Sequence, residues 1–435
     1  MESPSLPTRS YSQTRSSFSS KTPLKIPRMN LKIPNVTVHP ASLKYLHQGH
    51  PWVTLDSFSK KFPPNPFLIA REAKSSFLLL HDPHHNKIKA RLWSSQTSVP
   101  VVSVETFHTQ LLDRLRAAIL KRKVLRASHP QVFKRDNFYL FFAEADFIPG
   151  LQGLLLGDRL ILLDFTKTIW ESHLDFIFSQ VKQLATTILE LEIREMFYQK
   201  RPGPFLTYPD KTPARANPFV IKEFDLRYNL NFTLGSDPGL YTDMSAVRFH
   251  TAPLFPQARV LNLFSYTGAF SLFALAHGAR QVTSVDLSPK YMALLTENLR
   301  LNPHLDPAKH QALIGPVNAK VKDLEAAHAL FEVIICDPPS ASSDGHSRHN
   351  HWKTAGELLA SLDPLLASGG SLVVFNNTHQ ITRKKFEQDL RQIPALKKYS
   401  MKEFYGLDFD CPRLPHFPEG DYLKGVLLKK IHSSS

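Results

Sequence analysis

The alternation of strands and helices between residues 258 and 376 places the strongest constraint on the fold. Strands that alternate with helices in this way form βαβ units and a parallel, doubly wound sheet. A ligand of such a sheet lies beyond the carboxyl ends of its strands. The predicted strands are 258–264, 281–286, 331–336 and 370–376, and the predicted helices lie near 269–277, 289–300 and 353–367.

Polar residues follow the first two of these strands. The first strand ends in "NLFSYTG" (262–268), and the second ends at Asp286, eighteen residues after Gly268. An acid at that position can accept hydrogen bonds from a ribose diol. A dinucleotide needs further glycines for its pyrophosphate, but Phe264 and Tyr266 occupy this loop. The loop therefore favours S-adenosylmethionine, which has a ribose and a carboxylate but no phosphate.

The third strand ends in Asp337-Pro338-Pro339. Two prolines fix the backbone and cannot continue a hydrogen-bonded ladder. Beside an adenosine pocket, such a rigid strand end is suited to hold the edge of a planar base. The alternative is a plain strand terminator before a loop.

The charge, apolar content and cysteine count of the chain limit what it can bind and where it can work. The chain has 53 Lys and Arg against 38 Asp and Glu, a net charge of +15, which favours a polyanion such as nucleic acid. No apolar run is long enough to span a membrane. The two cysteines, Cys336 and Cys411, exclude a disulfide framework and a zinc knuckle, and they fit a reducing compartment. No metal site is predicted, because His346, His349 and His351 are expected in a solvated or phosphate-contacting loop.

The first half of the chain reads as a tail, a small β domain and an α+β region. Residues 1–34 are predicted to be a disordered basic tail, with an organelle transit peptide as the alternative. The apolar stripe of the helix predicted over 171–200 is expected in the core, with a homodimer contact as the alternative. The other predicted elements are a helix (42–53, leading into a turn), strands within 35–103, a helix (104–124), a strand (137–146), a hairpin turning at Gly157-Asp158 (151–165) and a linker or irregular excursion (201–218).

Four motifs carry a family resemblance. "VLNLFSYTGAFS" (260–271), "VTSVDLS" (282–288), "DPPS" (337–340) and "FPEGDYLKG" (417–425) resemble the large-subunit ribosomal RNA methyltransferases of the cytosine-C5 type. The resemblance implies large-subunit ribosomal RNA as the partner and the cytoplasm as the compartment, or an organelle if the tail is a transit peptide. It also implies a domain order: a PUA-like β domain (35–103), an α+β middle domain with linker (104–218) and a class I methyltransferase domain with a Rossmann-like α/β sheet (219–435).

Carried over position by position, the resemblance also implies site residues. The partner of the adenine amino group stays open between Asn318 and Asp323. The expected catalytic residues are Asp337, Pro338, Pro339 and Asn377. The expected cofactor contacts are Tyr241, Asp243, Phe264, Ser265, Tyr266, Thr267, Gly268, Asp286, Leu287 and Asp337.

One departure from the family changes the predicted chemistry. In "LVVFNNTHQIT" (372–382), Asn377 stands where the cytosine-C5 enzymes have a cysteine. Carbon 5 of cytosine becomes nucleophilic only after a thiolate adds to carbon 6, and an amide cannot do this. The Phe-Asn-Asn run (375–377) resembles instead a guanine-N7 large-subunit methyltransferase domain, and asparagine pairs well with purine edges.

We therefore expect methylation of a base nitrogen in large-subunit ribosomal RNA, with guanine favoured. The alternative is an RNA-binding ribosome-assembly factor with a degenerate methyltransferase site. Methylation of a small molecule or a protein is a weaker third reading.

Overall fold

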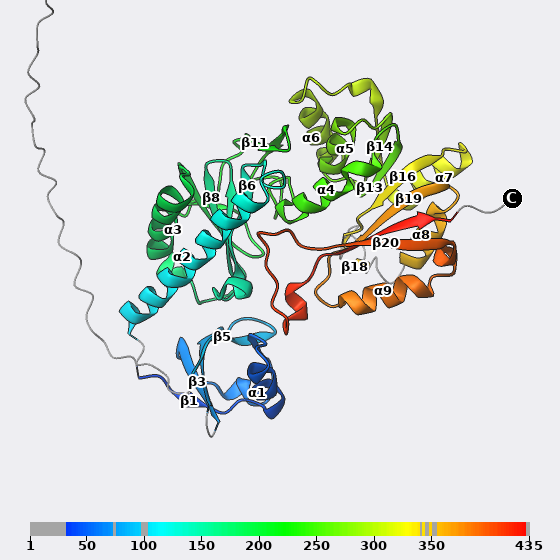
Figure 1. The fold of residues 1–435 in the computed structure, drawn as a ribbon. Helices are drawn as coiled ribbons and strands as arrows, with labels where there is room; N and C mark the ends of the chain where they lie inside the picture. The colour runs from blue at the N-terminus through cyan, green and yellow to red at the C-terminus, as the bar shows by residue number, and fades with distance from the viewer. Residues whose placement is uncertain are drawn as a thin grey trace, which may run out of the picture.

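The structure is a computed structural model that describes residues 32–72, 75–96, 103–339, 342–343, 348–349 and 355–431 (Figure 1). Almost all of the predicted tail lies outside these ranges, as do His346 and His351. Among the described helices, none is both long and apolar enough to cross a membrane.

The first region is a five-stranded sheet with one short helix. Its strand order is β1-β3-β4-β5-β2, and Leu46 of the helix packs into the same small core as Val53 and Leu79. The predicted strands within 35–103 are confirmed, but the turn predicted before residue 53 passes directly into a strand. The elements are β1 (Asn35–Val36), α1 (Pro40–His47), β2 (Trp52–Thr54), β3 (Phe67–Glu72), β4 (Ser75–His81) and β5 (Ile88–Gln96).

The middle region is a second five-stranded sheet, ordered β10-β9-β8-β7-β6. Two helices pack against one face of this sheet and share a core with it (Figure 1). The hairpin is confirmed, and Gly157 has the positive φ (+64°) that its turn requires. The elements are α2 (Val104–Ser128), β6 (Asn137–Phe142), β7 (Leu151–Leu156), β8 (Arg159–Asp164), α3 (Leu174–Leu189), β9 (Glu195–Lys200) and β10 (Leu206–Thr207).

The helix predicted over 171–200 is wrong at its C-terminal end. It stops at Leu189, where Glu190 adopts a left-handed conformation (φ +58°), and residues 195–200 form β9, parallel to β8. Phe197 and Tyr198 are both buried, on opposite faces of a strand covered from both sides. Because a doubly covered strand lacks the alternating pattern, its apolar residues also fit a helical period.

Of the two alternatives for residues 201–218, the structure shows the irregular excursion, which is folded onto the protein and contains only the short strand β10. Leu206 pairs with Tyr198 of β9, and Phe205 is buried. A hairpin of β11 (Phe219–Glu223) and β12 (Leu226–Leu230) follows, and then helix α4 (Ser245–Thr251).

The last region contains the predicted doubly wound sheet. The seven strands are ordered β15-β14-β13-β16-β19-β21-β20; the first five run parallel, and β21 runs antiparallel to both of its neighbours, β19 and β20. The four predicted strands are confirmed as neighbours, while β15, β20 and β21 were not predicted. The elements are β13 (Arg259–Leu263), α5 (Ala269–Ala276), β14 (Gln281–Asp286), α6 (Pro289–Arg300), β15 (His310–Ile314), α7 (Val317–Ala326), β16 (Phe331–Cys336), β17 (Ser342–Ser343), β18 (Arg348–His349), α8 (Ala355–Leu362), β19 (Leu366–Asn376), α9 (Arg383–Gln392), β20 (Tyr399–Tyr405) and β21 (Lys424–Lys430).

The two larger sheets are joined by a common core. Helices α5 and α6 cover one face of the seven-stranded sheet, and α7, α8 and α9 cover the other. The first of these faces shares its core with the middle sheet, so that Tyr139 and Leu154 lie in one cluster with Phe270 and Phe375. The middle region is therefore packed against the side of the seven-stranded sheet that α5 and α6 cover.

Candidate active site

A cavity of about 950 Å³ lies at the carboxyl ends of β13, β14 and β16. We call it the first cavity. Its volume is within the range of clefts that enclose a drug-sized ligand, roughly 300–1,000 Å³. Predicted site residues that line it are Tyr241, Phe264, Ser265, Tyr266, Thr267, Asp286, Leu287, Asn318, Asp337, Pro339 and Asn377.

The loop after β13 forms one wall in a conformation that few sequences adopt. Phe264 and Tyr266 have positive φ values of +58° and +51°, which cost free energy for residues with a side chain. Two hydrogen bonds hold the loop: Ser265 donates its N–H to the Val285 carbonyl (3.0 Å), and Thr267 donates its hydroxyl to the Gly239 carbonyl (2.5 Å). The loop is thus fixed before any ligand arrives.

Gly268 is tightly packed and is not among the residues that line the first cavity. It precedes α5 with φ +84°, and a Cβ there would lie 2.4 Å from Leu295 Cγ. The glycine is needed for packing against α6, and its predicted contact with the cofactor stays a prediction.

Asp286 is oriented by the backbone. Its carboxylate accepts the N–H groups of Tyr266 (2.8 Å) and Ser288 (2.9 Å). Burial raises its pKa, against the effect of these bonds. Of the two candidates left open for the adenine, Asn318 lines the cavity, whereas Asp323 pairs with Lys320 (2.9 Å) and does not.

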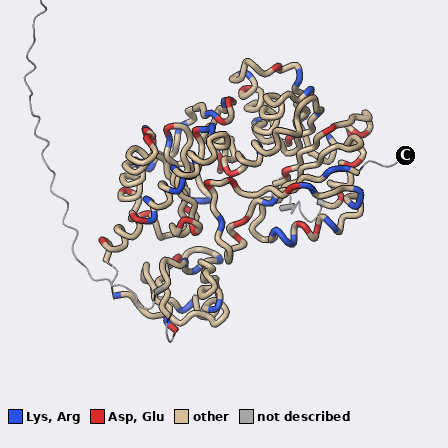
Figure 2. Tube along the Cα trace, viewed as in Figure 1, with Lys and Arg blue, Asp and Glu red and all other residues tan. Residues whose placement is uncertain are grey.

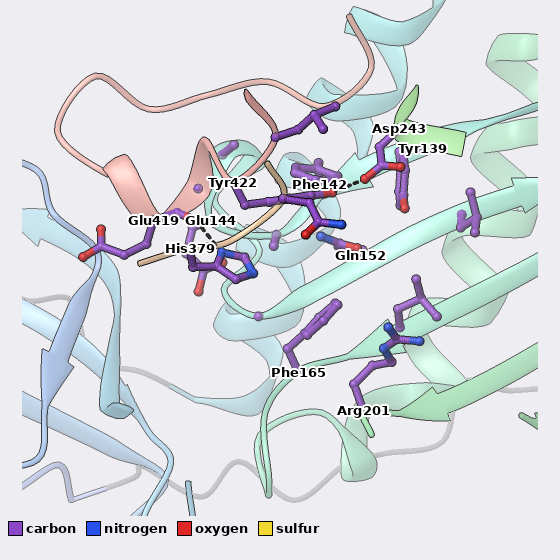
Figure 3. Close-up of a pocket in the computed structure, with 18 of the residues that line it drawn as sticks. Tyr139, Phe142, Glu144, Gln152, Phe165, Arg201, Asp243, His379, Glu419 and Tyr422 are labelled. Atoms are coloured by element: carbon purple, nitrogen blue, oxygen red, sulfur yellow. Dashed lines mark hydrogen bonds between the residues drawn. The ribbon is translucent and has the colours of Figure 1, made fainter. Parts of the chain in front are cut away.

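A second cavity, of about 760 Å³, opens beside the first and draws residues from all three regions. Figure 3 shows Gln152 of the middle sheet across from His379 of the last region, and Glu419 pointing away towards the first region, where it lies 3.2 Å from His50. The first region contributes Trp52, whose indole N–H donates to Glu144 (2.8 Å). We call this the second cavity.

The two cavities meet at a small set of shared residues. Asp337 and Asn377 each have a side-chain Oδ1 that is buried and has no hydrogen-bond partner within the described ranges. Burial, and secondarily the nearby Asp243 carboxylate, raise the pKa of Asp337 to about 7, against the lowering effect of Arg248. The residues that line both cavities are Leu240, Tyr241, Met244, Asp337 and Asn377.

The neighbours of Asp337 and Asn377 keep these residues in place. Pro338 is buried and lines neither cavity, so it acts as a backbone brace, while Pro339 lines the first cavity. The ammonium of Lys424 donates to the Thr378 carbonyl (2.5 Å), directly after Asn377. Burial lowers the pKa of Lys424 to about 8.

Neither cysteine reaches this junction. Cys336 and Cys411 are buried and line neither cavity. Burial raises the pKa of both thiols, Cys336 further through Asp337 and Cys411 through Asp410, so both are poor nucleophiles.

Asp243, predicted as a cofactor contact, lines only the second cavity. It accepts a hydrogen bond from the Tyr422 hydroxyl (2.5 Å), and burial raises its pKa. Tyr422 lies on the segment between β20 and β21, residues 406–423, which we call the strap. Tyr422 belongs to the motif of residues 417–425, but the sequence did not predict a role for this residue.

Buried ion pairs bind the strap to the middle region. Arg135 lies 3.0 Å from both Asp408 and Asp410, and Arg122 donates to the Asp410 carbonyl (2.7 Å). Removing one partner of a buried pair strands the other charge, at a cost of about 3–5 kcal/mol. Only the fold could reveal these pairs, since the partners are more than 270 residues apart.

The fold and these cavities define a class I methyltransferase arrangement, and comparisons with known proteins agree. The S-adenosylmethionine-dependent methyltransferase family model matches residues 185–427. The chain belongs to this family, and its cofactor is S-adenosylmethionine.

The relatives cover nearly the whole chain. A protein of Deinococcus radiodurans named ribosomal RNA large subunit methyltransferase is 25% identical, over 93% of this chain and 98% of its own. Ribosomal RNA large subunit methyltransferase I of Alteromonas mediterranea is 24% identical, over 90% of this chain and 98% of its own.

Solved structures show the same fold. A methyltransferase complexed with SAH matches 91% of this chain and 100% of its own, with a TM-score of 0.78 and 21% identity. A SAM-dependent methyltransferase from Streptococcus mutans gives the same coverage and identity with a TM-score of 0.76. The predicted α/β class with a Rossmann-like sheet is confirmed.

Proposed function

We propose that this enzyme methylates a base nitrogen, with guanine favoured, in large-subunit ribosomal RNA. The observation that carries the proposal is the junction of the two cavities at Asp337 and Asn377, each with an unpartnered buried oxygen. A buried polar atom without a partner costs about 1–3 kcal/mol, and a ligand that donates hydrogen bonds there would offset this cost.

Ribosomal RNA as the substrate is supported by the relatives' names and by charge. Both relatives cited above are named for the large ribosomal subunit. The net charge is +15, and Figure 2 shows Lys and Arg on every region of the described chain. Positive charge spread in this way suits contacts with many phosphates of a folded RNA.

In the proposal, the first cavity holds the cofactor. The Asp286 carboxylate, already oriented by two backbone N–H groups, accepts hydrogen bonds from the ribose; Leu287 and Asn318 flank the adenine. Phe264, Ser265, Tyr266, Thr267 and Tyr241 surround the rest. The bound cofactor supplies a methyl group on a positively charged sulfur, which a lone pair can attack.

The second cavity receives the base, extruded from the RNA into the junction. Asn377 offers both a donor and an acceptor to a purine edge. Ionised Asp337 accepts a hydrogen bond from an N–H of the base and takes up a proton where the target nitrogen carries one. Tyr241, Asp243 and Tyr422 form the wall that keeps the base in place.

The position of the cysteines supports a nitrogen target. Methylation at carbon 5 of a pyrimidine needs a thiolate at the junction. Cys336 and Cys411 lie outside both cavities, and Asn377 occupies the junction. A ring nitrogen such as guanine N7 already has a lone pair, so positioning and exclusion of water suffice.

In this proposal, each region of the chain has the role that the family resemblance implies. A PUA-like domain (35–103) and a middle domain (104–218) hold the RNA, and the domain of residues 219–435 carries the reaction. The cytoplasm remains the proposed compartment, because the two free cysteines fit a reducing environment.

Transfer of a labelled methyl group tests the proposal. Ribosomal RNA from cells that lack the gene is incubated with the protein and labelled S-adenosylmethionine, and nucleosides are then mapped by mass spectrometry. Label on a guanine nitrogen is expected. Label on a pyrimidine carbon would overturn the assignment of the atom, and no label in any RNA would overturn the proposed function.

A further inference from the structure

One row of residues across the middle sheet forms part of the second cavity. Phe142 pairs with Gln152, Gln152 with Leu163, and Leu163 with Gln199, on four adjacent strands. All four side chains line the cavity. Since residues paired across strands point to the same face, the row is a continuous floor with a glutamine at its centre.

Two polar groups on this floor have no partner. Gln152 is 9% exposed and Tyr139 is 8% exposed. Neither the Gln152 amide nor the Tyr139 hydroxyl makes a hydrogen bond in the part of the chain that the structure describes, although both residues line the cavity (Figure 3). Every other residue of the six-residue strand β7 is apolar. Neither polar group is fully shielded from solvent, so each faces the cavity and is open to a ligand.

Gln199, on the same floor, has a structural role, because its amide is fully used in hydrogen bonds to the fold. Its amide donates to the carbonyls of Gly203 (2.7 Å) and Ser236 (3.0 Å) and so holds two loops. Gln152 holds nothing. The contrast within one row indicates that Gln152 serves a ligand rather than the fold.

The surroundings of Gln152 suit a nucleotide. Phe165 is half-buried beside it, and the Arg201 guanidinium lies 5.8 Å from the Phe165 ring centre. Figure 3 shows Gln152 between Phe142 and Phe165, on the same side as Arg201. The Arg201 guanidinium is paired with Asp237 (3.2 Å), so the groups open to a ligand are the aromatic ring, which can stack a base, and the free amide, which can read its edge.

These residues line the second cavity but not the first. The second cavity extends from Asp337 at the junction to Trp52 and Arg91 of the first region, and its volume exceeds what the target base alone needs. The floor around Gln152 therefore lies along the path of the RNA, beyond the base at the junction.

We propose that Gln152 and Tyr139 read the nucleotide adjacent to the target base, which stacks on Phe165. The inference rests on the proposed function and extends it: Asp337 and Asn377 select the target, and the middle sheet selects its neighbour. A bidentate contact of a side-chain amide with a base edge discriminates by about 1–3 kcal/mol.

The test uses RNA fragments that span the mapped methylation site, with each neighbouring nucleotide replaced in turn by the other three. Wild-type protein is expected to prefer one nucleotide at one neighbouring position by roughly 5- to 150-fold in kcat/KM. Gln152→Leu and Tyr139→Phe should reduce that preference, Gln152→Leu abolishing it. Affinity for S-adenosylmethionine, measured by calorimetry, and thermal stability should stay unchanged. Gln183→Leu, on the exposed side of α3, is the matched control.

Three outcomes would overturn the inference. Wild-type protein could show no preference at any neighbouring position, or Gln152→Leu could keep the full preference. Gln152→Leu could also lower thermal stability while kcat/KM stays unchanged, which would make the residue structural. Each of these leaves the proposed function intact, whereas absence of methyl transfer by the wild-type protein would remove both.

Discussion

The two cavities differ in how they are built. The first is formed largely by segments that follow consecutive strands of one sheet, so its lining residues recur along a short stretch of chain. The second is formed by three regions, with residues from Trp52 to Leu423, and it exists only because the strap returns to the middle sheet. Under the proposed function, this difference makes binding of the cofactor and choice of substrate separable, because one depends on a local motif and the other on the assembly of three regions.

The largest expected effect is at the junction, where the two cavities meet. Asp337→Asn should lower kcat by about 10²- to 10⁴-fold if the target nitrogen carries a proton, because the amide cannot take it up, and by much less if the target is a nitrogen without one, such as guanine N7. Single-turnover methyl transfer measures the effect. Asp323→Asn, which changes an exposed acid outside both cavities, is the control. If kcat were unchanged in Asp337→Asn, methyl transfer would not take place at the junction.

The pH dependence follows from the same residue. Because the pKa of Asp337 is raised to about 7, its ionised fraction rises about tenfold per pH unit below 7 and levels off above it. The rate should follow this curve, and Asp337→Asn should flatten it. A pH–rate profile from pH 5.5 to 8.5 measures this; a wild-type profile without a rise towards pH 7 would contradict the assignment.

The stability of the wild type should move in the opposite direction. A carboxyl group whose pKa is higher in the folded than in the unfolded state destabilises the fold once it ionises. Relative to Asp337→Asn, the wild type should therefore lose stability between about pH 4 and pH 7. Urea denaturation of both proteins across that range measures the difference, and parallel curves would contradict the raised pKa.

Gly268→Ala tests the packing beneath the first cavity. The new Cβ would lie 2.4 Å from Leu295 Cγ, on a backbone with φ +84°. Overpacking and the left-handed conformation together should lower the free energy of unfolding by about 2–4 kcal/mol. Gly49→Ala, with φ +89° and open space around the Cβ, isolates the conformational part and should cost about 1 kcal/mol. Equal losses in the two variants would show that Leu295 moves aside.

Asp286→Asn sharpens the comparison by affecting the first cavity alone. The amide keeps one acceptor and loses the charge, so the Kd of S-adenosylmethionine should rise about 10- to 100-fold, equivalent to roughly 1–3 kcal/mol. RNA affinity should not change. Calorimetry and filter binding measure the two, with Asp306→Asn, an exposed capping aspartate, as the control. A parallel loss of RNA affinity would mean that the cavities are coupled.

The smallest effect is expected at the strap. Tyr422→Phe removes the hydrogen bond to Asp243, worth about 0.5–1.5 kcal/mol, and should raise the KM for RNA by a few-fold. Affinity for the cofactor should stay within twofold. Tyr405→Phe, which loses a weaker bond to Glu403 (3.3 Å), is the matched control. A change confined to cofactor binding would assign the strap to the first cavity instead.

The sequence was informative where a feature depends on neighbours in the chain. The four parallel strands, the acid after β14 and the Asp-Pro-Pro after β16 were all predicted, because strand periodicity and strand-end chemistry are local. Strands β20 and β21 were missed, since β21 is inserted antiparallel between β19 and β20 and so departs from the strand–helix alternation that predicted the other strands. Strand β9 was missed because both of its faces are covered.

The sequence by itself determined the class of fold, the cofactor family and the absence of a cysteine at position 377, since each follows from residue types and their spacing. The tertiary structure alone decided that Gly268 serves packing, that Asp243 faces the second cavity, and that Gln152 is buried without a partner. The physical reason is that burial and pairing are properties of contacts between distant segments. No pattern along the chain records which side chains a fold leaves unsatisfied.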